Sequence, residues 1–277
     1  MRTITSRHNP LIARFRAAER VHRKERQYVL LDSPRLIDDA CRAGIRPEVA
    51  IFSIGELQRS DRNLLKLAKR LESLGTEVMA ASASVLSILS PVRAPSGAVA
   101  LAPHKPIPFE RVIEDNGIVL ALMGVQNPGN LGAIIRAADA GSAAGVLVLD
   151  GSADPFSWKA LRGAMGSTFH LPVADVTDGA AAIRRVHASS ATVMAAVPRG
   201  GTSLYDVDLT KTRVILIGGE GSGLSSEIID MVDDRISIPM KPDVESLNAA
   251  VAAGLIVYEA RRQQIAVSRQ QLSEHTS

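Results

Sequence analysis

The chain has 277 residues, of which 46% are hydrophobic and 22% charged, and its formal net charge is only +3. These values favour a soluble globular protein of one or two domains. Aromatic residues make up 3% of the chain, so binding that depends mainly on rows of stacked bases is disfavoured. Cys41 is the single cysteine, which excludes an intrachain disulfide and a cysteine-cluster metal site.

Neither a membrane segment nor a metal site is expected. The N-terminus lacks the apolar core of a signal peptide, and no run approaches the length of about 18 apolar residues that a spanning helix needs. The six histidines show no ligand spacing such as H-x-x-x-H. We therefore expect a cytoplasmic protein that holds no metal ion.

Positive charge is concentrated at the start of the chain. Residues 1–26 contain eight arginine and lysine residues against two glutamates, a local charge of +6 that leaves −3 for the remainder. This asymmetry indicates a basic N-terminal arm or helix that binds phosphate groups. An ordinary solvated helix face is the alternative.

Strand-like and helix-like segments alternate over residues 27–101. The expected strands are YVLL, VAIFS, EVMAA and GAVALA, and the expected helices cover residues 34–43, 61–74 and 83–89. This alternation predicts a small α/β domain. Residues 102–112 follow with three prolines among their first seven positions, and they are expected to form an extended linker.

A second domain is expected over residues 113–266. An apolar strand at 118–125 leads through the turn QNPGN into a helix at 131–140, for which Asn130 is a plausible N-cap. Further strands are expected at GVLVLD, TVMAAV, 214–217 and 235–238. The pattern predicts a largely parallel sheet with helices on both faces. The polar residues 267–277 are expected to form a frayed tail.

The glycine-rich turn at 218–223 is the strongest local signal of ligand binding. Glycine permits φ > 0 and has no Cβ, so this turn can place backbone N–H groups against a small ligand. A dinucleotide site is disfavoured because the G-x-G-x-x-G spacing is absent and Glu220 would face a pyrophosphate. Ser246 is a plausible N-cap for a last helix whose small residues allow another helix to approach, from this chain or a second copy.

Three segments resemble, in the same order, the three motifs of the SpoU (TrmH-type) RNA 2'-O-ribose methyltransferases of the SPOUT superfamily. They are NPGNLGAIIRAADA at 127–140, IGGEGSGLS at 217–225 and IPMKPDVESLNAAVAAG at 238–254. The resemblance implies an α/β catalytic domain with a deep trefoil knot that binds S-adenosylmethionine. It also implies a homodimer. The stretch from SRHNPLIARF to DDACRAG resembles the L30e-like substrate-binding domain that many of these enzymes carry.

The resemblance also implies roles for individual residues. Arg136 lies one turn after Gly132, and we expect its guanidinium to grip a substrate phosphate and to stabilise the developing alkoxide, because arginine is a poor base. The full catalytic set is Arg136, Asn130, Glu220, Ser246 and Asn248. The residues expected to enclose the methyl donor are Gly218, Gly219, Glu220, Gly221, Ile238, Met240 and Leu247. The expected RNA-binding residues are Arg14, Arg16, Arg23, Lys24, Arg26, Lys159 and Arg162.

The chain departs from the family pattern at three places. Gly219 stands where many members have Asn, Ala250 where many have Ser, and Asp32-Ser33 where the N-terminal domain usually has Glu-Gly. The expected function is S-adenosylmethionine-dependent methylation of a ribose 2'-hydroxyl in structured RNA. The N-terminal domain favours ribosomal RNA. Transfer RNA as substrate, and a non-catalytic RNA-binding protein of the same fold, are the alternatives.

Overall fold

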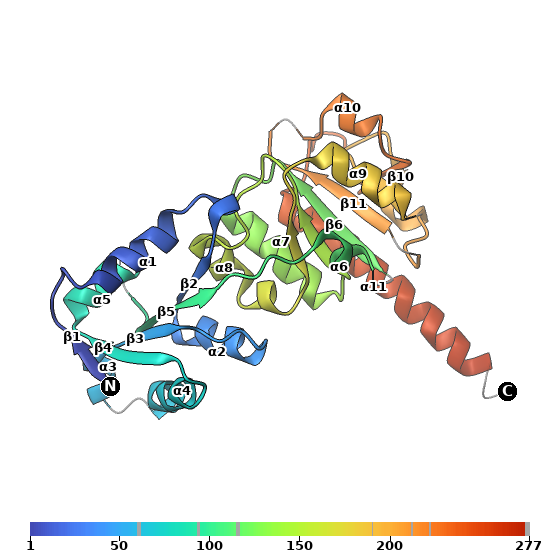
Figure 1. The fold of residues 1–277 in the computed structure, drawn as a ribbon. Coiled ribbons are helices and arrows are strands. Elements are labelled where there is room, and N and C mark those ends of the chain that lie inside the picture. The colour runs from blue at the N-terminus through green and yellow to red at the C-terminus, as the bar shows by residue number, and fades with distance from the viewer. Residues whose placement is uncertain are drawn as a thin grey trace. The chain divides into compact units, whose positions relative to one another are not determined.

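The chain folds into two compact units. The computed structural model describes residues 1–59, 62–92, 95–114, 117–189, 191–211, 213–221 and 223–274. Unit 1 comprises Met1–Lys105 and Phe156–Phe169, and unit 2 comprises Pro106–Pro155 and His170–Ser277 (Figure 1). Residues 156–169, which the sequence placed within the second domain, thus pack with the first unit.

The described residues of unit 1 contain a mixed sheet with the strand order β1-β4-β3-β5-β2. The three strands β1, β4 and β3 are parallel, whereas β5 is antiparallel to both β3 and β2. The strands are β1 (Arg2–Ile4), β2 (Tyr28–Asp32), β3 (Val49–Ser53), β4 (Glu77–Ala81) and β5 (Ala98–Pro103). The helices of this unit are α1 (Pro10–Arg20), η1 (Arg23–Glu25), α2 (Pro34–Arg42), α3 (Ile54–Gln58), α4 (Arg62–Ser73), α5 (Ala83–Leu89), α8 (Trp158–Ala164) and η2 (Ser167–Phe169).

Both faces of the unit 1 sheet are covered. Because side chains alternate along a strand, Val29 and Leu31 of β2 join one apolar cluster while Leu30 joins another. The first cluster includes residues of α2, α4 and α8, and the second includes residues of α1 and α5. Leu161 is fully buried in the first cluster, which explains why α8 belongs to this unit. The first residue of the helix expected at 61–74 lies outside the described residues.

The basic N-terminal segment was expected to form an arm or a helix. It contains the helix α1 and is an integral part of unit 1. Strand β1 pairs with β4, and α1 buries Ile12 and Phe15 in the core. Arg26 is also buried, and its Nη1 donates to the carbonyl oxygens of Ala18 and Tyr28, each at 3.4 Å. A count of charges does not show that Ile12, Phe15 and Ala18 recur at intervals of three residues and form the buried face of α1.

The described residues of unit 2 contain a parallel sheet with the strand order β10-β12-β9-β11-β6-β7-β8. The strands are β6 (Ile118–Met123), β7 (Gly145–Val148), β8 (Val173–Asp175), β9 (Thr192–Ala196), β10 (Thr202–Ser203), β11 (Arg213–Gly218) and β12 (Asp234–Ser237). The helices are α6 (Phe109–Ile113), α7 (Pro128–Ala140), α9 (Gly179–Ala188), η3 (Leu204–Asp206), α10 (Ser226–Ile229) and α11 (Ala249–Glu274). The predicted α/β fold class is confirmed, while the knot stays a prediction.

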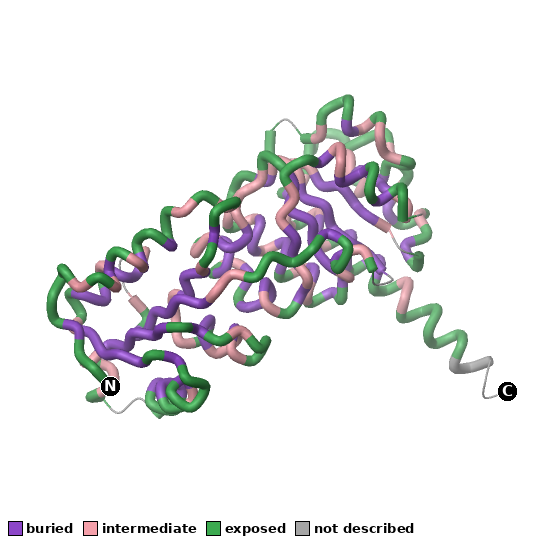
Figure 2. The backbone as a smooth tube through the Cα atoms, viewed as in Figure 1, coloured by how far each residue is buried: buried purple, intermediate pink, exposed green. Residues whose placement is uncertain are grey.

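The central strands of unit 2 are apolar except for Thr192 and Arg213 at the starts of β9 and β11, and they are largely buried, as expected for strands covered on both faces (Figure 2). On one face, side chains of α6, α9 and α10 form a cluster with alternate residues of β6, β7, β9 and β11. The helices α7 and α11 pack against each other and against strands of the same sheet. A Cβ on Gly141, at the C-cap of α7, would overlap Cγ1 of Val257 in α11, so a larger residue there would force this helix contact to shift.

The two helices that follow sequence motifs begin at other residues than expected. Helix α7 starts at Pro128 and not at residue 131, and Asn127 is its N-cap because its Oδ1 accepts from the amides of Gly129 at 2.8 Å and Asn130 at 3.3 Å. Proline suits a first helical position because it has no N–H to satisfy. Asn130 therefore lies within the first turn, and its side chain is free for another role.

Asn248, and not Ser246, caps helix α11. Its Oδ1 accepts from the amides of Ala250 at 2.9 Å and Val251 at 3.3 Å. The expected frayed tail is also wrong over residues 267–274, which continue α11 (Figure 1). No glycine or proline follows Gly254, so no residue type interrupts the helix. Residues 275–277 lie outside the described part of the chain.

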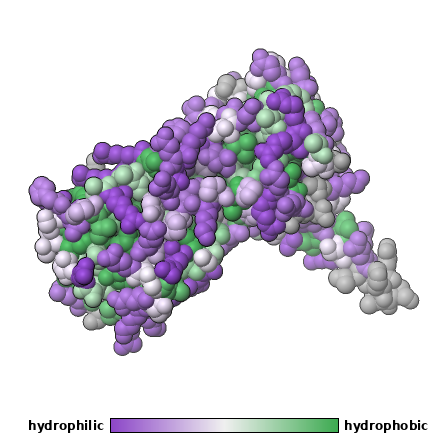
Figure 3. Space-filling model, viewed as in Figure 1, coloured by the Kyte–Doolittle hydropathy of each residue, from purple (hydrophilic) through white to green (hydrophobic). Residues whose placement is uncertain are grey.

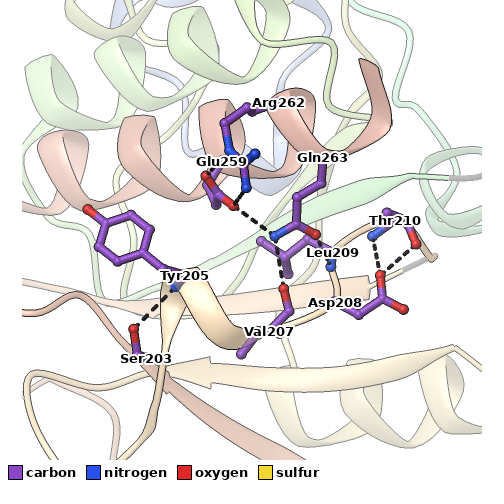
Figure 4. A network of polar contacts seen from close by, with 9 residues as sticks. All are labelled: Ser203, Tyr205, Val207, Asp208, Leu209, Thr210, Glu259, Arg262 and Gln263. Atoms are coloured by element: carbon purple, nitrogen blue, oxygen red, sulfur yellow. Dashed lines mark hydrogen bonds and ion pairs between the residues drawn. The ribbon is translucent and has the colours of Figure 1, made fainter. Parts of the chain in front are cut away.

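A polar network ties α11 to the segment that precedes β11 (Figure 4). Gln263 Nε2 donates to the carbonyl of Val207, and Gln263 Oε1 accepts from the amide of Leu209 at 2.8 Å. The largely buried Glu259 accepts from Arg262 and from Gln263. The hydrogen bond from Arg262 lowers the pKa of Glu259, so its contribution to stability is present above the unfolded-state pKa and is lost as pH falls through the lower folded value.

None of the helices in the described ranges has the length and apolarity needed to cross a bilayer. In the space-filling view, hydrophilic residues cover much of the visible surface of both units (Figure 3). Many of the buried apolar residues form clusters on both faces of the unit 1 sheet and on one face of the unit 2 sheet.

We predict that Phe15→Ala lowers the free energy of unfolding of unit 1 by about 3–5 kcal/mol, because a fully buried aromatic ring is removed. Chemical denaturation followed by circular dichroism measures the effect. The neighbouring exposed variant Arg16→Ala is the control and should change stability by less than about 0.5 kcal/mol. Equal stability of the Phe15→Ala and parent proteins would restore the idea of a detached arm.

Candidate active site

A cavity of about 590 Å³ lies in unit 2, lined by the segments that follow β9, β11 and β12. These strands are parallel neighbours, so their carboxyl ends meet at one edge of the sheet, where ligands of such folds bind. The segments after β11 and β12 were predicted as the ligand site. The predicted residues that line the cavity are Gly218, Gly219, Glu220, Gly221, Ile238, Met240, Ser246, Leu247 and Asn248.

The glycine-rich loop is folded back on itself. Gly219 and Gly223 form an isolated antiparallel bridge, and a Cβ on Gly218 would lie 2.7 Å from the carbonyl carbon of Gly223. Gly221 and Gly223 have φ values of +102° and +64°, which L side chains rarely adopt. The loop therefore needs glycine for its turn and for its close approach to itself, and it presents mostly backbone to the cavity.

The departure at Gly219 has a structural reason. Its amide donates to the carbonyl of Met123 at 2.8 Å, which brings the loop onto the residues after β6. A Cβ on Gly219 would overlap the carbonyl oxygen of Gly124. Gly124 has φ +73° and in turn contacts Gly151 closely, so the loop rests on two further glycine backbones. A side chain at position 219 is incompatible with this packing.

The carboxylate of Glu220 binds two other predicted catalytic residues, Asn130 and Asn248, which are far from it and from each other in sequence. Its Oε1 accepts a hydrogen bond from Nδ2 of Asn130, in the first turn of α7, and one from Nδ2 of Asn248 at 3.1 Å. A carboxylate is an acceptor only, so two amide donors are its proper partners. Asn248 uses its Oδ1 to cap α11 and its Nδ2 to hold Glu220. The starts of two helices and the glycine-rich loop thus meet at one oxygen atom.

Arg136 is exposed on α7, one and a half turns beyond Asn130. No hydrogen bond or ion pair joins it to any described residue, and it does not line the cavity. Gly132, one turn earlier on the helix, is buried. The guanidinium is therefore available to an external anion, for which its planar set of donors is well suited.

The segment that follows β9 also lines the cavity and was not predicted from the sequence. Ala196, Val197 and Pro198 line the cavity, and Arg199 donates to the carbonyl oxygens of Pro242 and Val244, the latter at 3.3 Å. Arg199 therefore links two of the segments that enclose the cavity. The position of β9 beside β11 in a parallel sheet was the signal that could have found it, but strand order cannot be read from one sequence.

The basic residues predicted to bind RNA are not equivalent. Arg14 pairs with Glu48 and lies 4.5 Å from the ring centroid of Tyr28, whereas Arg16 and Lys24 are exposed. Arg26 is excluded as a surface contact by its burial. Lys159 and Arg162 are exposed but stand on α8, in unit 1, and Arg23 belongs to η1.

Among the residues that the structure describes, no group of three or more His, Cys, Asp or Glu side chains is arranged to hold a metal ion.

The fold is a parallel α/β sheet with a glycine-lined cavity at its carboxyl edge, and an Asn-Glu-Asn hydrogen-bonded set includes two residues of the cavity lining. These features define a class of protein that binds a small cofactor. The profile of the SpoU rRNA Methylase family matches residues 117–258, which contain all of these features. The chain belongs to the SpoU rRNA methylase family, as its three motifs indicated.

Several relatives are similar over most of the chain. An uncharacterised tRNA/rRNA methyltransferase of Synechocystis is 32% identical over 96% of each chain. The 23S rRNA (uridine(2479)-2'-O)-methyltransferase of Streptomyces viridochromogenes is 34% identical over 76% of each. Among solved structures, an AdoMet-bound rRNA methyltransferase from Sinorhizobium meliloti superposes with a TM-score of 0.83 at 28% identity, over 94% of this chain and 97% of the other. The SpoU methyltransferase AviRb from Streptomyces viridochromogenes, in complex with AdoMet, has a TM-score of 0.81 at 28% identity, over 93% of this chain and 100% of the other.

We predict that Gly219→Ala weakens binding of S-adenosylmethionine, the ligand of those two structures, by at least about tenfold. The added methyl group must push the loop away from Gly124, and such overpacking costs about 1–3 kcal/mol. Titration calorimetry measures the affinity. Gly55→Ala is the control, because a Cβ there would contact only Ser53 Oγ at 3.9 Å. Unchanged affinity in the Gly219→Ala protein would show that the loop is not held against Gly124.

Proposed function

We propose that this protein transfers a methyl group from S-adenosylmethionine to a ribose 2'-hydroxyl of ribosomal RNA. The observation that carries the proposal is the meeting of Asn130, Glu220 and Asn248 at the rim of the cofactor cavity, with Arg136 exposed on the same helix as Asn130. The named activities of the relatives support the same conclusion: the Streptomyces relative is a 23S rRNA 2'-O-methyltransferase, as is RlmP of Bacillus subtilis, which is 35% identical over 52% of this chain.

The cavity fits S-adenosylmethionine. Its volume of about 590 Å³ lies within the usual range of small-molecule sites, about 300–1,000 Å³. Backbone of Gly218, Gly219 and Gly221 would hold the polar parts, and the apolar side chains of Ile238, Met240 and Leu247 would enclose the flat adenine. When bound, S-adenosylmethionine supplies an electrophilic methyl group on a sulfonium.

The remaining catalytic work falls to residues of this chain. Alignment of the 2'-hydroxyl and loss of its proton dominate the barrier of such a displacement. The Arg136 guanidinium grips the phosphate next to the reacting ribose and stabilises the negative charge that develops on its oxygen. Asn130 and Asn248 fix the Glu220 carboxylate, and Ser246 lies on the same segment as Asn248, so these groups orient the target nucleotide at the cavity rim.

Unit 1 is the substrate-binding part in this proposal. It resembles an L30e-like domain, and the similar rRNA methyltransferase structures extend over both units of the chain. The exposed cations Arg16 and Lys24, together with Lys159 and Arg162, supply positive charge for RNA phosphates. This organisation favours ribosomal RNA over transfer RNA. The proposal includes a cytoplasmic location.

The active form is a homodimer. Val251, Leu255 and Tyr258 are 52%, 40% and 56% exposed, and their spacing places them on one face of α11. An exposed apolar stripe of this kind marks an interaction surface, and the small residues around it allow a second helix to approach closely. The stripe begins within one turn of Asn248, so a second copy would border the catalytic residues.

We predict that Arg136→Ala reduces methyl transfer to ribosomal RNA by at least about a hundredfold, equivalent to about 3 kcal/mol, because a contact that strengthens in the transition state is lost. S-adenosylmethionine affinity and the melting temperature should not change, since Arg136 is exposed and outside the cavity. Arg136→Lys should recover little activity, because an ammonium cannot reproduce the bidentate grip.

The matched control for Arg136 is Arg184→Ala, which removes another exposed helical arginine of unit 2. It should retain nearly full activity. Transfer of labelled methyl groups to alkali-resistant, 2'-O-methylated dinucleotides is the measurement. An Arg136→Ala enzyme that works within a fewfold of the parent rate would refute the assigned role.

We also predict that Leu255→Lys converts the dimer to a monomer of 29.4 kDa in analytical ultracentrifugation at micromolar concentration, because it places a charge in the apolar stripe. Leu65→Lys is the control, since Leu65 is an exposed leucine on α4 of unit 1. It should remain dimeric. A parent protein that sediments as an active monomer would contradict the proposed assembly.

A further inference from the structure

A small hollow of about 50 Å³ lies within unit 1, where the start of α2 meets α8. Six of its lining residues are Asp32, Arg35, Asp39, Trp158, Arg162 and Met165. It includes the turn at which this chain departs from its family, with Asp32-Ser33 in place of Glu-Gly. Ser33 Oγ caps α2 by accepting from the amide of Leu36, so Asp32 is the residue of this turn that remains to be explained.

Asp32 is a poorly satisfied carboxyl group. Its Oδ1 accepts from Ser90 Oγ at 3.0 Å, but its Oδ2 is buried and has no hydrogen-bond partner among the described residues. Burial raises the pKa of Asp32, and this effect exceeds the lowering by Ser90 and by the nearby charge of Arg162. Buried polar atoms are rarely left without a partner, and Asp32 is one of the residues that line the hollow.

The charges around the hollow favour a neutral ligand over a phosphate. Arg35 and Arg162 are exposed donors, while Asp32 and Asp39 are acceptors, with Asp39 Oδ2 4.0 Å from Nε of Arg35. Two carboxylates would repel a phosphate group, but donors and acceptors side by side match the edge of a nucleobase. Among RNA bases guanine is the best match, because on a single edge its O6 accepts from arginine while its N1–H and N2–H₂ donate to a carboxylate.

One wall of the hollow is flat and apolar. Trp158, the single tryptophan of the chain, is half-buried there, and Lys159 Nζ lies 5.4 Å from its ring centroid. Met165 is 39% exposed at the rim. A base needs such a surface for stacking. The volume corresponds to roughly four waters at about 10–15 Å³ each, which is room for the edge of a base and not for a whole nucleotide.

We propose that this hollow is a base-reading subsite for an unpaired guanine of the RNA substrate, with the base against Trp158 and its edge between Arg162 and Asp32. The inference rests on the proposed function in that RNA is taken as the ligand. It goes further by placing base recognition in unit 1, on α8. In the sequence, this helix lies between β7 and β8 of the unit 2 sheet.

The fluorescence of Trp158 reports directly on this site, because the full chain has no other tryptophan. The probes are four single-stranded RNAs of six nucleotides, one all uridine and three with a single central guanine, adenine or cytosine. We expect the guanine RNA to quench the fluorescence saturably, with a Kd at least about fivefold lower than that of the other three. Asp32→Asn should abolish this preference, and Arg162→Ala should weaken binding of the guanine RNA by at least about fivefold.

Lys69→Ala is the matched control, because it removes an exposed cation of unit 1 on α4, a helix that does not line the hollow. It should leave the guanine preference unchanged. If Asp32→Asn fails to fold, Arg162→Gln tests the same edge of the base at an exposed position. Equal Kd values for the four RNAs, or equal losses from Lys69→Ala and Arg162→Ala, would overturn the subsite.

The test separates this inference from the proposed function. Quenching by short RNAs requires neither S-adenosylmethionine nor methyl transfer. A guanine preference in a protein that never methylates RNA would leave the subsite standing and refute the enzyme. Methylation of ribosomal RNA by a protein without base preference at Trp158 would do the reverse.

Discussion

The carboxylate of Glu220 is the contact on which the rest of the site depends. One of its oxygen atoms accepts hydrogen bonds from Asn130 at the start of α7 and from Asn248 at the start of α11. The two helices also pack against each other, so the shared acceptor aligns their first turns at one point of the cavity rim. Removal of Glu220 would take the shared acceptor from both asparagines, whereas removal of either asparagine would leave the carboxylate held by a single donor.

Glycine backbone provides the second constraint. The loop that carries Glu220 rests on Gly124 through Gly219, and no side chain fits between them. This packing fixes the height of the loop above the sheet, and therefore the position of the Glu220 carboxylate relative to Asn130. Rigid placement of polar groups before the substrate binds is what electrostatic catalysis requires. The departure from the family at Gly219 is thus a steric adjustment to Gly124 and need not impair the site.

Much of the fold could be predicted, because alternating apolar runs and turn residues are local signals. The three motifs identified most of the cavity for the same reason, since each is a contiguous stretch. What sequence could not supply was non-local. The burial of Arg26 depends on the packing of α1 beside β2. The place of α8 in unit 1 depends on Phe156 and Leu161, which enter a core formed by residues distant in sequence. The role of Arg199 depends on strand order. Asn127 and Asn248 were missed as caps because neighbouring Asn and Ser residues are equally plausible candidates.

A double-mutant cycle on methyl transfer to ribosomal RNA tests most directly whether Asn130 and Asn248 act through the shared Glu220. Asn130→Ala removes one donor, and Asn248→Ser removes the other while keeping a residue that can cap α11. If both asparagines serve to fix one carboxylate, the double variant should lose clearly less kcat/KM than the product of the two single losses, with a coupling energy of about 0.5–3 kcal/mol. Single losses that multiply in the double variant would show that the two residues act independently and would contradict the account.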